Sequence, residues 1–105
     1  MALRDLVLSL IARIRDPTIR ADISSTIYYL KDVYSTGRVS EEEILNSLFE
    51  VINDVLAFVQ PELTEEERRE RAVVLARQFL SAIKLETLRR RQLELMRGRL
   101  RRERL

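Results

Sequence analysis

The sequence predicts an all-α protein, a four-helix bundle whose last helix extends beyond the bundle as a basic arm. Two observations lead to this fold. Apolar residues recur at i, i+3, i+4 and i+7 along most of the chain, the spacing of one helix face. Glycine and proline number only two each, which leaves little material for hairpins. At 105 residues the chain is one domain of modest size.

The first two predicted helices meet at Asp16-Pro17. An apolar stripe runs from Leu3 to Ile14, and proline then excludes the preceding residue from the α region. Asp16 is well placed as the N-cap of the second helix, with Pro17 at its first position. This helix runs to about Tyr34. The residues expected to face inward are Ile19, Ile23, Ile27, Leu30 and Val33.

The third helix has the strongest local signal in the chain. Gly37 is expected to end the second helix as a left-handed C-cap. Ser40 and Glu43 then have capping-box spacing, and Val39 and Ile44 have the spacing of a hydrophobic staple. Apolar residues cover well over half of this helix's circumference, so we expect it to be the central and most buried helix. They are Ile44, Leu45, Leu48, Phe49, Val51, Ile52, Val55, Leu56, Phe58 and Val59.

The fourth helix is predicted from Glu65 to the last residue. Thr64 and Glu67 form a second capping box, and Gly98 is the only weak point in the rest of the helix. A helix of this length spans about 60 Å, whereas a compact domain of this size has a radius of gyration of about 13 Å. Its second half therefore cannot reach the core. Favourable i,i+4 pairs are Glu65 with Arg69, Glu67 with Arg71, and Glu86 with Arg90.

Charge divides the chain at the same place. Residues 1–83, the predicted bundle, contain 10 Lys and Arg and 14 Asp and Glu, a net charge of −4. Residues 84–105 contain 9 basic and 3 acidic residues, a net charge of +6. This segment predicts nucleic-acid binding, because arginine recognises phosphate. The candidate residues are Lys84, Arg89, Arg90, Arg91, Arg97, Arg99, Arg101, Arg102 and Arg104.

Apolar residues alternate with these arginines and form a strip that predicts a protein interface. They are Leu85, Leu88, Leu95, Met96 and Leu100. Three interpretations of the segment stay open: a solvated basic helix end, a nucleic-acid-binding arm, and an interface with a second copy or another subunit. The leading hypothesis is a small accessory or structural subunit that binds DNA or RNA within a larger assembly. The alternatives are a homo-oligomer and an adaptor that caps an acidic partner protein.

The composition argues against an enzyme. The chain has no histidine and no cysteine, so general acid–base catalysis would have to use carboxylates. Its clusters at residues 41–43 and 65–67 are explained by helix capping. No phosphate-binding or dinucleotide motif occurs, and no metal-ligand spacing is present. We therefore expect no catalytic residue, no metal, no cofactor and no small-molecule substrate.

Several other features bear on class and location. The tyrosines at positions 28, 29 and 34 are expected at the rim of the bundle. A helix-turn-helix spanning the second and third helices is rejected, because the latter is acidic at its start and apolar nearly throughout.

No secretory signal or membrane span is recognised, so a cytoplasmic location is expected. Arginine outnumbers lysine 17 to 2, which fits phosphate recognition, genome composition or a thermophilic source. No motif is specific enough to indicate a family.

Overall fold

The computed structural model describes the backbone of residues 2–103 and the side chains of residues 2–99. Within that part of the chain it consists of four α-helices and no strands, so the predicted all-α fold is confirmed. The helices are α1 (Leu3–Ile11), α2 (Pro17–Ser35), α3 (Glu41–Val59) and α4 (Glu65–Glu103).

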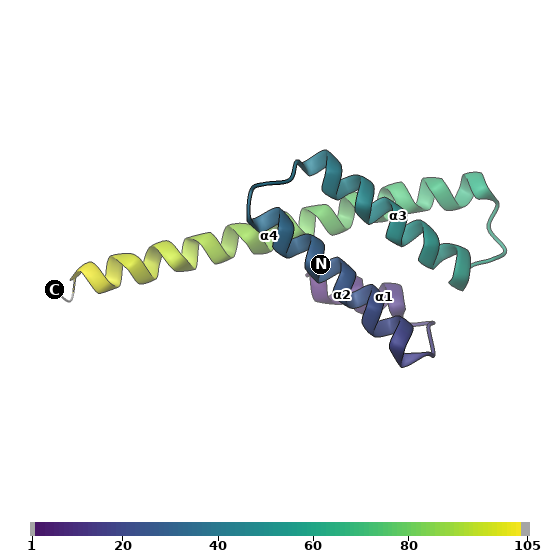
Figure 1. Ribbon diagram of the computed structural model, residues 1–105, viewed down its shortest axis with the longest axis horizontal. Helices are drawn as coiled ribbons and strands as arrows, with labels where there is room; N and C mark the ends of the chain where they lie inside the picture. Colours follow the sequence, from purple (N-terminus) through teal and green to yellow (C-terminus); the bar gives the residue numbers. More distant parts are fainter. Residues whose placement is uncertain (1, 104–105) are drawn as a thin grey trace.

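The antiparallel pair of α3 and α4 is the spine of the fold. These two helices pack against each other more extensively than any other pair, and α1 and α2 complete the bundle around them (Figure 1). The far half of α4 continues beyond the bundle as an isolated helix (Figure 1). The described chain therefore measures 62 × 28 × 21 Å, with a radius of gyration of 16.5 Å. A compact domain of this size would have about 13 Å.

Local capping sets the helix starts where the sequence predicted them. The Asp16 carboxylate accepts a hydrogen bond of 2.9 Å from the Thr18 N–H, with Pro17 in the first turn of α2. Gly37 has φ 71°, a left-handed conformation that favours glycine. The Ser40 hydroxyl accepts from the Glu43 N–H at 3.2 Å. These contacts satisfy N–H groups that have no partner within the first turn of a helix.

The start of α4 has a complete capping box. The Glu67 N–H donates to the Thr64 hydroxyl at 3.1 Å, and the Thr64 N–H donates to the Glu67 carboxylate at 3.0 Å. The pKa of the Glu67 carboxyl is lowered below its usual value. The hydrogen bond with the Thr64 backbone is the largest cause, and hydrogen bonding with the Thr64 side chain is the second. Glu65 also pairs with Arg69 at 3.2 Å, as expected from their spacing.

The core takes one apolar stripe from each helix. On α4 that stripe includes Ala72 and Ala76, which are fully buried, followed by Phe79 and Ile83. Small side chains permit close approach between helices, and larger residues fill the space beside them. The buried residues of the first three helices and their connections are Leu3, Val7, Ile11, Ile14, Ile27, Leu30, Ile44, Leu48, Ile52, Val55 and Leu56.

Three expectations about the first three helices need correction. α1 ends at Ile11, well before Asp16-Pro17, although Ile14 is still buried. Ile19 is 36% exposed and Phe58 is 64% exposed, so neither faces the core as predicted. Ile19 lies in the first turn of α2 and Phe58 in the last turn of α3. At these helix ends no further element covers the apolar face.

The three tyrosines lie where α2 meets solvent. Tyr28 and Tyr34 are half-buried at the edge of the bundle, and Tyr29 is exposed. The Tyr34 hydroxyl donates to the Glu41 carboxylate at 3.4 Å. Among residues 2–103, no helix combines the length and the apolar character that crossing a membrane requires.

Shortening the buried apolar side chains of α3 should destabilise the fold. Leu48 and Ile52 are fully buried, so Leu48→Ala or Ile52→Ala should lower the free energy of unfolding by about 2–5 kcal/mol. The matched control is Phe58→Ala on the exposed side of the same helix, with an expected cost of about 1 kcal/mol or less. Urea denaturation measures all three. Equal losses at the three positions would contradict this assignment of the buried face.

Candidate nucleic-acid and partner interface

The packing of α4 on the bundle ends at Thr87. Ile83 is fully buried and Thr87 is 6% exposed, whereas every residue from Leu88 to Arg99 except Gly98 is exposed. Packing thus continues one helical turn past the predicted boundary at residue 83. We call residues 88–103 the arm. Helical backbone continues through Gly98, the expected weak point, to Glu103.

Two ion pairs connect α4 to other helices where the arm begins. The Lys84 ammonium lies 3.0 Å from the Glu41 carboxylate in the first turn of α3. This hydrogen bond, reinforced by the charge of Glu41, raises the pKa of Lys84. Glu86 lies 3.2 Å from Lys31 of α2 instead of pairing with Arg90. Lys84, a candidate phosphate ligand from the sequence, is therefore occupied by a carboxylate of its own chain.

The described arginines of the arm are exposed to solvent. Arg90 pairs with Glu94 at 3.6 Å. No ion pair with any side chain among residues 2–99 is formed by Arg89, Arg91, Arg97 or Arg99. The side chains of the remaining candidates, Arg101, Arg102 and Arg104, lie outside the described residues. The arm thus offers uncompensated positive charge at a distance from the bundle.

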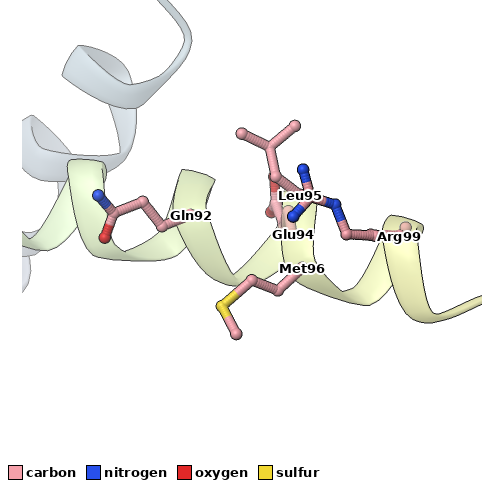
Figure 2. A pocket seen from close by; sticks show the side chains of 6 residues that line it. Gln92, Glu94, Leu95, Met96 and Arg99 are labelled. Atoms are coloured by element: carbon pink, nitrogen blue, oxygen red, sulfur yellow. The ribbon is translucent and has the colours of Figure 1, made fainter.

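The apolar strip predicted on this segment is also exposed. Leu85 is 58% exposed, Leu88 56%, Leu95 75% and Met96 61%; Leu100 lies outside the described side chains. With about 100° between successive residues of a helix, these four residues fall within a sector of about 100°. Figure 2 shows the side chains of Leu95 and Met96 extending from different sides of the helix, with no other element over them. We call these four residues the leucine strip.

The leucine strip points away from the bundle. The face of α4 that packs on the core carries Ala76, Phe79 and Ile83. Continued at the same helical spacing, this face carries Arg90, Glu94 and Arg97 on the arm. The leucine strip lies on the opposite side of the helix. Its apolar residues therefore are not an extension of the core stripe, and no element in the described part of the chain covers them.

The structure adds one apolar residue that the sequence analysis did not assign. Leu93 is 56% exposed and lies outside the sector of the leucine strip, toward Arg97. At about 100° per residue, it falls about 60° beyond Met96 around the helix and so lies outside the strip. Within residues 2–103, no group of three or more acidic side chains is arranged to hold a metal ion.

Comparisons with protein-family models, with curated proteins and with solved structures find no match to this chain. A function for it can therefore be proposed only from the geometry and charge of its own residues.

The pair between Lys84 and Glu41 predicts a pH effect. Because the pKa of Lys84 is raised in the folded protein, the pair stabilises the fold below the ordinary lysine pKa. This contribution is lost as the pH rises through the raised value. Glu41→Gln should return the Lys84 pKa toward its ordinary value, measured by NMR titration of the lysine side chains. An unchanged Lys84 titration would contradict the assigned cause.

Proposed function

We propose that this protein is a small, non-enzymatic accessory subunit that binds nucleic acid through the arginines of the arm. The observation that carries the proposal is the isolated helix beyond Thr87, on which Arg89, Arg91 and Arg97 have no carboxylate partner among the described side chains. Residues 84–105 have a net charge of +6 and residues 1–83 a net charge of −4. A polyanion is thus attracted to the arm and repelled by the bundle.

The distribution of arginines favours a ligand that surrounds the helix. Arg89, Arg90 and Arg91 point in three directions around one helical turn, so a flat surface contacts only some of them. The major groove of DNA is about 12 Å wide, admits one α-helix, and has phosphates along both edges. Duplex DNA is therefore the first ligand to test, and RNA the second. The proposal assigns residues 1–83 to a supporting bundle and residues 84–105 to binding, in a cytoplasmic assembly.

Neutralising the arm should weaken binding and its dependence on salt. Each phosphate contact on duplex DNA contributes about 0.9 to the slope of log affinity against log salt, because bound counterions are released. We expect the triple variant Arg89→Gln, Arg91→Gln and Arg97→Gln to reduce both the affinity and this slope, measured by fluorescence anisotropy over a range of salt concentrations.

The matched control removes three exposed arginines from the bundle, through Arg4→Gln, Arg13→Gln and Arg77→Gln. It changes the net charge equally and should retain most of the affinity. Equal losses of affinity in the two triple variants would show that net charge alone drives binding. If the wild-type protein does not bind nucleic acid, the proposed function is refuted.

A second function is supported by a separate observation, the leucine strip. Monomeric proteins rarely expose adjacent large apolar side chains without a use for them, and these lie on the side of α4 opposite the core. We propose that the strip mediates self-association. The double variant Leu88→Glu and Leu95→Glu places charges at exposed positions, so the bundle should stay folded. Its mass by sedimentation velocity should be lower than that of the wild type, and an unchanged mass would refute this function.

A further inference from the structure

We infer that the leucine strip of one copy binds a groove between α2 and α3 of a second copy, so that the chains assemble head to tail. This inference rests on the proposed self-association and identifies the surface that receives the strip. The groove is formed by Ile14, Ile19, Asp22, Ile23, Thr26, Val51, Asp54, Val55 and Phe58.

The groove has an apolar floor and apolar edges. Ile14 and Val55 are buried at 1% and 5% exposure, and Ile19 and Phe58 are the exposed members at 36% and 64%. These are the two residues that the sequence placed in the core and that the structure leaves uncovered. An apolar groove of this kind receives the apolar face of an amphipathic helix, with anchors at helical spacing.

The dimensions of the groove match those of the strip. One wall is formed by residues 19–26 of α2 and the other by residues 51–58 of α3. Each of these segments spans seven helical rises, about 10 Å. Leu88 and Leu95 are also seven residues apart on one face of α4, so both anchors fit within the length of the groove.

Charge on the two walls selects a basic partner helix. Asp22 on α2 and Asp54 on α3 are exposed, and neither forms an ion pair with the side chains of residues 2–99. On the arm, Arg89 and Arg91 lie on opposite flanks of the leucine strip. When the strip faces the groove, each arginine faces one wall. The occupant that fits this surface is therefore the arm of a second copy.

The positions of the two surfaces require an intermolecular contact. The groove includes the start of α2 and the end of α3, which lie at the end of the molecule away from the arm (Figure 1). Because α4 is one continuous helix from Glu65 to Glu103, an arm cannot turn back to the groove of its own chain. Pairing of two arms is disfavoured, since it would bring together two copies of residues 84–105, each with a net charge of +6.

This arrangement is compatible with nucleic-acid binding. A head-to-tail contact joins different surfaces and therefore builds a ring or an open chain of copies. Arg90 and Arg97 lie on the side of the arm opposite the leucine strip, so they stay accessible when the strip is bound. The assembly would present repeated arginine pairs to one polyanion, which increases the total affinity through multivalency.

Two full-length variants test the contact, because each removes one of its two sides. Phe58→Glu places a charge in the groove at an exposed position, and Leu88→Glu with Leu95→Glu removes the strip. We expect each variant alone to be monomeric in sedimentation velocity without nucleic acid, with circular dichroism as the control for folding. Mixed in equal amounts, they should form a heterodimer that grows no further, since one partner supplies only a strip and the other only a groove.

A charge exchange tests the role of the groove walls. Asp22→Arg with Asp54→Arg should raise the dissociation constant of self-association at least about tenfold, a difference of about 1.4 kcal/mol. Adding Arg89→Asp and Arg91→Asp to the same chain should restore association, because every groove and every arm then carries the exchanged charges. The matched control, Asp5→Arg with Asp32→Arg, reverses two exposed acidic residues that do not line the groove and should keep the wild-type constant.

The outcomes distinguish failure of the groove contact from failure of self-association itself. If the leucine variant is monomeric while Phe58→Glu associates like the wild type, self-association stands and the groove is not its site. If the mixture of the two variants stays monomeric, the head-to-tail contact is refuted. If the wild type is itself monomeric at all concentrations, both self-association and the groove contact are wrong.

Discussion

The close packing of α3 on α4 is the interaction on which the rest of the structure depends. Ala72 and Ala76 of α4 are fully buried in the core, and side chains of this size permit close approach between helix backbones. α3 has 19 residues and α4 has 39, so this packing covers only the first half of α4. The second half has no equivalent partner among residues 2–103, and the elongated shape is a direct result of this difference in length.

Continuity with the packed half prepares the arm for binding. An isolated helix of about 12 to 15 residues is only marginally stable in water because nucleation is costly. The arm avoids this nucleation step, since its first turn continues from the buried turn at Ile83 and Thr87. The ion pairs of Lys84 with Glu41 and of Glu86 with Lys31 lie at this junction. A partner would therefore bind a preformed helix, at a smaller entropic cost than folding a disordered tail.

The arm presents different chemistry on its two sides, and this allows the two proposed functions to operate together. The core-facing stripe of α4 continues as Arg90 and Arg97, while Leu88 and Leu95 face the opposite direction. An arginine face suits phosphate, whereas a leucine face suits an apolar groove with acidic walls. Arg89 and Arg91, which face the groove walls in the assembly, are then the side chains for which the two functions compete, whereas Arg90 and Arg97 stay on the side that is open to phosphate.

The sequence by itself determined the all-α class, the helix starts and the extended last helix. These features depend on local interactions: Asp16, Ser40 and Thr64 hydrogen-bond to backbone N–H groups two or three residues away. The exposed leucines and arginines of the arm were also predictable, from the length of one helix. Only the tertiary structure decided that Ile19 and Phe58 are uncovered and that Lys84 pairs with Glu41. Whether an apolar side chain is buried, or a charge compensated, depends on which distant residues pack beside it, and helical periodicity carries no information about those neighbours.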